Sequence, residues 1–188
     1  MANSKETLRH DARRKRAAQG ANPSLFTAAC DLFFAHVNPI SSAIIAGYWP
    51  SGSEFDVTPL MEEALHRGVL CCMPVIPEEG RVLNFREWTR DTKLREGLHG
   101  VFYPESGELL VPDIVIVPLL AFDQTGTRLG QGGGYYDATL ADLRAKKEML
   151  AIGLAYEEQA CLFDLPFEGH DQRLDMAVTP ERVYDFRK

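Results

Sequence analysis

Four glycines within five positions form the part of the chain whose composition is best suited to chemistry. The segment reads Arg128, Leu129, Gly130, Gln131, Gly132, Gly133, Gly134, Tyr135, Tyr136, Asp137. Glycine lets the backbone approach a ligand closely and turn successive N–H groups toward one point. A surface turn needs one or two glycines, and flexible linkers are usually padded with serine rather than tyrosine. The composition therefore favours a cradle for an anion, most simply phosphate.

Two common phosphate-binding motifs do not fit this segment. A dinucleotide-binding fingerprint requires a third glycine where Tyr135 stands, and it opens the first strand–helix unit rather than a late one. A P-loop requires lysine and then serine or threonine after its last glycine, where this chain has Tyr135 and Tyr136. The segment must therefore hold phosphate by another design.

With three further segments, the glycine-rich string strongly resembles the 5-formyltetrahydrofolate cyclo-ligases. Residues 5–9 (K-E-T-L-R) are similar to the family's amino-terminal K-x-x-L-R segment. Glu54 follows Tyr48, Trp49 and Pro50, where the family has a folate-contacting glutamate. Residues 170–175 (H-D-Q-R-L-D), followed by V-T at 178–179, resemble its carboxy-terminal pattern. Many members carry a lysine where this chain has Gly133.

This resemblance implies an enzyme, an ATP-dependent cyclo-ligase that forms a carbon–nitrogen bond. The implied reaction converts 5-formyltetrahydrofolate into 5,10-methenyltetrahydrofolate and releases ADP and phosphate. ATP phosphorylates the formyl oxygen, N10 attacks the activated carbon, and phosphate leaves. The protein would align the reactants, neutralise phosphate charge and exclude water. ATP is then a co-substrate, and Mg²⁺ accompanies it on one or two carboxylates.

The resemblance also implies roles for individual residues. Arg128 and Tyr135 are the expected catalytic residues: Arg128 offers phosphate a bidentate charge, and Tyr135 can stack on a ring and donate a hydroxyl. The expected nucleotide-binding residues are Lys5, Glu6, Thr7, Leu8, Arg9, Arg128, Leu129, Gly130, Gln131, Gly132, Gly133, Gly134, Tyr135 and Tyr136. The expected folate-binding residues are Trp49, Glu54, Gln131, Gly132, Gly133, Gly134 and Tyr135. The expected Mg²⁺ ligands are Asp171 and, second, Asp175. Asp137 is expected to cap the following helix instead.

The amino-terminal segment is basic on an otherwise acidic chain. Residues 1–16 hold six basic and two acidic residues, although the whole chain has a net charge of −7. Lys5 and Arg9 are four residues apart and share a helix face. We therefore expect residues 1–20 to form an amphipathic helix, with Leu8 and Ala12 on its apolar side, that closes over the nucleotide site. The remaining basic residues of this helix are expected to be solvated: Arg13, Arg14, Lys15 and Arg16.

Helices and strands are predicted to alternate along the rest of the chain. Asn22 and Pro23 predict a helix start, as do Thr58 and Pro59. The predicted buried strands are residues 43–48, 69–73, 113–117 and 149–155, and a helix is predicted at 137–147. Residues 81–104 predict an irregular flap or hairpin.

The fold expected from this order is α/β, a single domain over residues 1–188. It is a Rossmann-like open, mostly parallel sheet with helices on both faces. Ligands in such sheets bind beyond the carboxyl ends of the strands. Residues 49–54, residues 119–123 and those after 155 should therefore meet in one cleft.

Composition sets the expected surroundings. The four cysteines lack the spacing of a metal site, and the longest apolar stretches are too short to span a bilayer. We expect a cytoplasmic monomer that acts on 5-formyltetrahydrofolate and its polyglutamylated forms, with no nucleic acid or membrane partner.

Two other functions remain open at this point. Sugar-phosphate isomerases and CoA-transferase-like α/β enzymes also carry glycine-rich phosphate loops and need no ATP. A non-catalytic folate- or RNA-binding regulator could use the basic amino-terminal helix.

Overall fold

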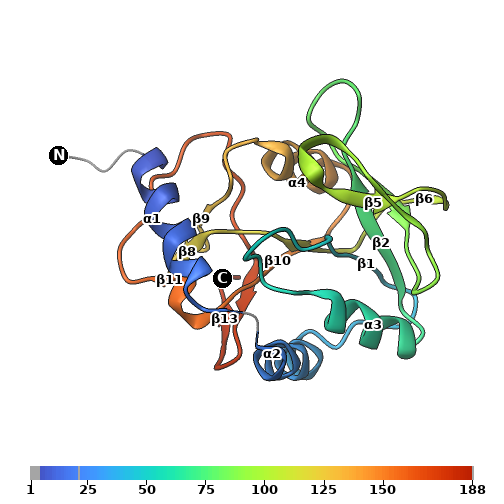
Figure 1. Ribbon diagram of the computed structural model, residues 1–188, viewed down its shortest axis with the longest axis horizontal. Helices are drawn as coiled ribbons and strands as arrows, with labels where there is room; N and C mark the ends of the chain where they lie inside the picture. Colours follow the sequence, from blue (N-terminus) through green and yellow to red (C-terminus); the bar gives the residue numbers. More distant parts are fainter. Residues whose placement is uncertain (1–4, 21, 188) are drawn as a thin grey trace.

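The large sheet confirms the α/β prediction. The computed structural model describes residues 5–20 and 22–187 (Figure 1). Eight strands lie in the order β13-β12-β10-β7-β1-β2-β3-β6. Their bounds are β1 (Ile44–Ala46), β2 (Leu70–Val75), β3 (Asn84–Glu87), β6 (Leu109–Leu110), β7 (Ile114–Val117), β10 (Leu150–Leu154), β12 (Met176–Val178) and β13 (Val183–Asp185). The strands from β12 to β2 pair in parallel, whereas β13, β3 and β6 are antiparallel additions at the two edges.

Helices cover both faces of this sheet, as predicted. The helices are α1 (Lys5–Ala17), α2 (Pro23–His36), α3 (Thr58–His66) and α4 (Tyr135–Lys146), with short 3₁₀ turns η1 (Leu98–Gly100) and η2 (Glu157–Gln159). In Figure 1, α2 and α3 lie on one side of the sheet and α4 on the other. Alternate residues of β7 serve the two layers: Ile116 packs in the α2–α3 core and Val117 in the α4 core. Burial on both faces explains why the strands read as continuous apolar runs.

Two smaller strand groups complete the fold. One is a three-stranded sheet in the order β11-β8-β9, formed by β8 (Ala121–Asp123), β9 (Arg128–Leu129) and β11 (Ala160–Cys161). The other is the hairpin of β4 (Leu94–Glu96) and β5 (Phe102–Pro104), within the region expected to form a flap or hairpin. The buried Asp123 carboxylate accepts the N–H groups of Thr125 (2.8 Å), Thr127 (3.1 Å) and Leu165 (2.8 Å). It thereby fixes the turn from which the glycine-rich segment departs.

Helix α1 lies on the small sheet, beside β8, β9 and β11 (Figure 1). Leu8 and Ala12 pack against its buried side chains, which confirms the apolar side of this helix. Arg14 and Lys15 are exposed as expected, but the prediction for Arg16 was wrong, because its side chain is only 5% exposed. Arg16 follows Ala12 by four residues and therefore shares its buried face.

The element boundaries differ from prediction at three places. Asn22 caps α2 through the N–H of Ser24 at 3.1 Å, as expected, but Thr58 is not a cap, because the N-cap of α3 is Val57. Helix α4 begins at Tyr135, two residues early. The strands β12 and β13 were not foreseen, since each contains only three residues. Within the described part of the chain, no helix is both long and apolar enough to cross a membrane.

Candidate active site

The glycine-rich segment connects the small sheet directly to α4. Strand β9 ends at Leu129, and Gly134 is the N-cap of α4. Gly132 and Gly134 have φ values of +105° and +71°, which residues with a side chain rarely adopt. The first N–H groups of a helix lack intrahelical partners and lie at the positive end of its dipole. This arrangement suits an anion, which is the chemistry the sequence predicts for the segment.

Helix α1 contacts this segment through two arginines. The Arg9 Nε donates to the carbonyl of Gly130 at 3.1 Å, and the Arg13 Nε donates to the side-chain oxygen of Gln131 at 3.0 Å. The Arg9 Cζ lies 3.3 Å from the position that a Cβ atom on Gly132 would occupy. The structure therefore brings α1 and the glycine-rich segment together. That α1 closes over a bound nucleotide stays a prediction.

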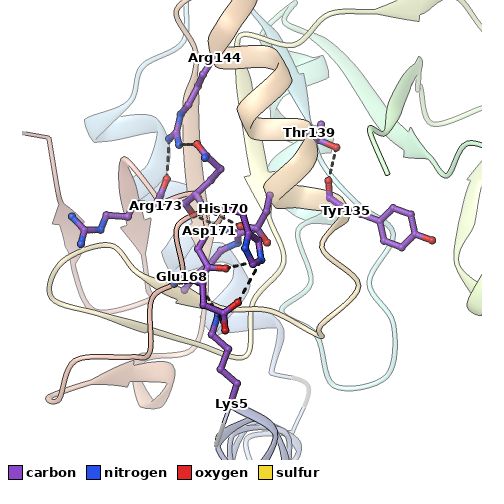
Figure 2. Close-up of polar contacts among 11 residues, drawn as sticks. Lys5, Tyr135, Thr139, Arg144, Glu168, His170, Asp171 and Arg173 are labelled. Carbon is purple, nitrogen blue, oxygen red and sulfur yellow. Dashed lines mark hydrogen bonds and ion pairs between the residues drawn. The ribbon is translucent and has the colours of Figure 1, made fainter. Parts of the chain in front are cut away.

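The first turn of α1 reaches an acidic group near the carboxyl end of the chain. Figure 2 shows Lys5 between Glu168 and Asp171, and its Nζ lies 3.0 Å and 2.8 Å from their oxygens. Burial alone would lower the pKa of Lys5, but the hydrogen bonds to Asp171 and Glu168 raise it above its ordinary value. Burial would raise the pKa of Asp171, and the hydrogen bond from Lys5 lowers it below its usual range. Both groups are thus held in their charged forms near neutral pH.

The other expected nucleotide-binding residues of α1 differ in their surroundings. Glu6 is exposed and accepts a hydrogen bond from Arg9 at 3.2 Å. Thr7 is also exposed. Leu8 is half-buried and faces the small sheet. Leu8 therefore positions the helix, whereas the charged residues face the segment at 130–134.

Arg128 is engaged within the protein rather than free. Its side chain is 4% exposed, and it donates to Asp137 at 2.9 Å and to the carbonyl of Gln172. Asp137 also accepts the N–H of Gln172 at 2.9 Å, so it ties the 170–175 segment to α4. The expectation that Asp137 caps α4 was wrong, because the helix has no side-chain cap. The contact of Arg128 with phosphate stays a prediction. Its buried Nε has no hydrogen-bond partner among the described residues.

The two tyrosines at the start of α4 have different neighbours. The ring of Tyr135 points away from the acidic group of Glu168 and Asp171 (Figure 2). Burial raises the pKa of Tyr136, the charge of Glu54 raises it further, and Arg128 lowers it. Glu54 therefore lies close enough to Tyr136 for its charge to act there, which brings the expected folate-contacting turn to the start of α4.

Glu54 itself is held by its own turn and by α1. One carboxylate oxygen accepts the N–H of Ser51 at 3.0 Å, and the other lies 3.9 Å from Nη1 of Arg16. A cleft of about 370 Å³ opens beside it, and its lining includes Arg16, Phe26, Asp56 and Tyr156. Its side chain is 12% exposed, so the carboxylate is largely shielded from water.

Trp49 and Arg16 fix the surroundings of this turn. The ring of Trp49 packs edge-on to Phe102 of β5, with the ring centres 6.5 Å apart. Arg16 donates to the Ser53 hydroxyl at 3.2 Å and to the Leu119 carbonyl at 3.0 Å. Arg16 thus joins the segments at 49–54 and 119–123, which the sequence predicts to meet.

The two expected Mg²⁺ ligands are in different environments. Asp171 lies with Glu168 and His170 in a group whose potential ligand atoms all lie within 4.8 Å of one another. Asp175 is not part of this group, because one of its oxygens accepts the N–H of Ala151 at 2.7 Å and pairs with Arg144 at 2.9 Å. Mg²⁺ prefers oxygen ligands, which both carboxylates of the group supply. The geometry favours Asp171 over Asp175.

Comparison with known proteins decides the family. The model of the 5-formyltetrahydrofolate cyclo-ligase family matches residues 1–180. The chain belongs to this family. It is 32% identical to the 5-formyltetrahydrofolate cyclo-ligase of Haemophilus influenzae over 68% of this chain and 70% of that protein. It is 31% identical to the enzyme of Escherichia coli K12 over 76% of this chain and 80% of that protein.

A solved structure agrees with this assignment. The NMR structure of Aquifex aeolicus 5,10-methenyltetrahydrofolate synthetase superimposes with a TM-score of 0.79 at 29% identity, over 98% of this chain and 93% of that one. The chain is therefore an enzyme of the cyclo-ligase family, which sets aside the isomerase-like and regulatory alternatives.

Two residues of this cyclo-ligase site escaped sequence analysis. Arg16 was hidden inside a run of basic residues, although the spacing of Leu8, Ala12 and Arg16 places all three on one helix face. Glu168 carried no sequence signal, since its role depends on Lys5 of a helix that is distant in sequence.

Proposed function

We propose that this enzyme uses ATP to convert 5-formyltetrahydrofolate into 5,10-methenyltetrahydrofolate, with release of ADP and phosphate. The observation that carries the proposal is the reach of α1. Arg9 of this helix binds the carbonyl of Gly130, and Arg16 binds the Ser53 hydroxyl beside Glu54. One helix therefore joins an anion-binding segment to a shielded carboxylate, as expected of a site that holds a nucleotide next to a pterin.

The reaction makes one C–N bond at the expense of one phosphoanhydride bond. The formyl oxygen attacks the γ-phosphorus, and the bond to the leaving ADP breaks. N10 then attacks the formyl carbon and loses its proton, and the carbon–oxygen bond breaks to release phosphate. The formyl group is an amide and a poor electrophile, so phosphorylation supplies the leaving group that ring closure needs.

Residues 130–134 and the start of α4 provide for the phosphate end of this reaction. Their backbone N–H groups can surround phosphate oxygens. Arg9, 20% exposed and adjacent to Gly132, can share its charge with the same group. Such groups act mainly by positioning and by neutralising charge, which is the principal demand of phosphoryl transfer.

Glu54 and Trp49 provide for the folate end. The amino-pyrimidine edge of a pterin offers two adjacent N–H donors, which match the two oxygens of a carboxylate. Glu54 is already oriented by the N–H of Ser51. Trp49, half-buried against Phe102, offers an apolar wall for the ring system.

Mg²⁺ would enter with the nucleotide and neutralise charge on its phosphates. The residues that fit it best are Asp171 and Glu168, whose carboxylates are within reach of one another. Lys5 now lies between them, so the ammonium supplies the local positive charge. Metal binding therefore requires Lys5 to share these oxygens or to leave them.

The test is turnover of the purified chain. Methenyltetrahydrofolate absorbs in the near ultraviolet, and its appearance should match ADP release one to one and require both ATP and Mg²⁺. The matched control is Lys146→Gln, since Lys146 pairs with Asp142 on the exposed face of α4 and should leave turnover unchanged. Conversion without ATP, or ATP hydrolysis without conversion, would contradict the proposal.

A further inference from the structure

The cations that the sequence assigns to phosphate already have partners in the structure. Lys5 is paired with Glu168 and Asp171, Arg9 with Glu6 and Gly130, and Arg128 with Asp137 and Gln172. Arg13 is bound to Gln131. An incoming phosphate must therefore compete for each of these groups or share it.

Arg81 lies against the same segment and differs from all of them. Its Nη1 is 3.3 Å from the position that a Cβ atom on Gly134 would occupy. Arg81 is exposed and makes no hydrogen bond or ion pair within residues 5–20 and 22–187. It does not pair with Glu78 or Glu79 of its own loop, so its charge is uncompensated.

The position of Arg81 is fixed by the segment that carries it. The N–H of Leu83 donates to Oγ1 of Thr139 at 2.9 Å. The Thr139 hydroxyl in turn donates to the carbonyl of Tyr135 at 2.6 Å, a contact drawn in Figure 2. Two residues after Arg81, the loop is thus attached to the first turn of α4. The guanidinium is held near the amino terminus of that helix by a buried contact.

Electrostatics explains why this placement is informative. The amino terminus of a helix carries partial positive charge, so a second cation placed there is unfavourable unless an anion lies between them. Gly134 leaves room for the guanidinium, and its φ of +71° disfavours any side chain at this position. An arginine offers a phosphate two parallel N–H donors, which a lysine cannot.

We propose that Arg81 is a further nucleotide-binding residue, whose guanidinium contacts a phosphate group held at the amino terminus of α4. The inference rests on the proposed function and adds to it a cation on the side of the glycine-rich segment next to Gly134, where Arg9 lies over Gly132. The two arginines come from α1 and from the β2–β3 loop. The nucleotide is therefore held between segments that are distant in sequence.

The experiment compares Arg81→Gln with Arg90→Gln. Arg90 is also exposed, pairs with Glu62 at 3.4 Å and lies outside the site, so its variant should match the wild type. Loss of a charge-assisted contact should raise the KM for ATP and the Kd for ADP about tenfold to a hundredfold. The KM for 5-formyltetrahydrofolate and the melting temperature should stay unchanged, and Arg81→Lys should recover part of the affinity.

Three outcomes would overturn the inference. Unchanged ADP affinity in Arg81→Gln would remove this residue from the nucleotide site while leaving the proposed function intact. A rise in the folate KM alone would assign the guanidinium to a folate carboxylate instead. Calorimetric titration of the wild type with ADP separates the two proposals, because absence of any ADP binding would refute both.

Discussion

Arg16 is the residue of α1 whose replacement should cost the most stability. In Arg16→Met the apolar stem remains, but the contacts to Ser53 at 3.2 Å and Leu119 at 3.0 Å are lost, together with the charge 3.9 Å from Glu54. The Leu119 carbonyl keeps a partner, since it also accepts from Gln159 at 2.9 Å. The main cost is therefore Glu54, left shielded from water without its cation.

This accounting gives a magnitude. A hydrogen bond from a charged donor contributes about 1.5–3 kcal/mol, and breaking a buried ion pair costs about 3–5 kcal/mol. The distance of 3.9 Å and the retained partner of Leu119 reduce both terms, so we expect a loss of about 2–4 kcal/mol. For a chain of this size, the melting temperature should fall by roughly 5–15 °C.

The assay is urea unfolding followed by circular dichroism. Arg14→Met is the matched control on the same helix, because the Arg14 side chain is 77% exposed and should cost less than about 0.5 kcal/mol. In the double variant Arg16→Met/Glu54→Gln, the combined loss should fall short of the sum of the single losses by about 1–2 kcal/mol. Equal losses in Arg14→Met and Arg16→Met, or strictly additive single variants, would refute the pairing of Arg16 with Glu54.

Three further predictions follow from the same geometry. Gly132→Val should raise the KM for ATP more than Gly130→Ala does in steady-state kinetics, because only Gly132 combines a φ of +105° with the nearby Arg9 guanidinium. Glu54→Gln should weaken 5-formyltetrahydrofolate about tenfold to a hundredfold by turning an acceptor toward a donor, and a change confined to ATP would contradict this role. Burial and then the hydrogen bond to Glu157 raise the pKa of Tyr184 to about 12, so the neutral form stabilises the fold below its unfolded pKa near 10. The stability difference between wild type and Tyr184→Phe should therefore be constant below pH 9 and decline as the pH rises from 10 to 12, as measured by urea unfolding at each pH.

The parts of the fold that follow local rules were predictable from sequence. Asn22 and Pro23 began α2 because side-chain capping and a fixed φ act within a few residues. The apolar run at 113–117 gave β7, since a strand buried on both faces needs apolar residues throughout. The strands β12 and β13 were missed because three residues carry too little periodicity.

The candidate site was predictable where composition alone carries information, and less so where charges find distant partners. Four glycines indicated an anion cradle, and the spacing of Lys5 and Arg9 indicated one helix face. Arg16 looked like the solvated residues beside it, because only tertiary packing distinguishes it from Arg14. Asp137 had the sequence position of a cap, but Arg128 offered its carboxylate a stronger, charged partner. Deleting residues 1–10 would test α1 poorly, since it also removes Leu8 from the small sheet.

The central claim is that the formyl oxygen attacks the γ-phosphorus of ATP at the glycine-rich segment. Its most direct test starts from 5-formyltetrahydrofolate labelled with ¹⁸O in the formyl group and follows the label by mass spectrometry of the released phosphate. The mechanism transfers that oxygen from carbon to phosphorus, so each phosphate should contain one ¹⁸O atom from the folate. Phosphate free of the label, with ¹⁸O appearing in water instead, would contradict the account.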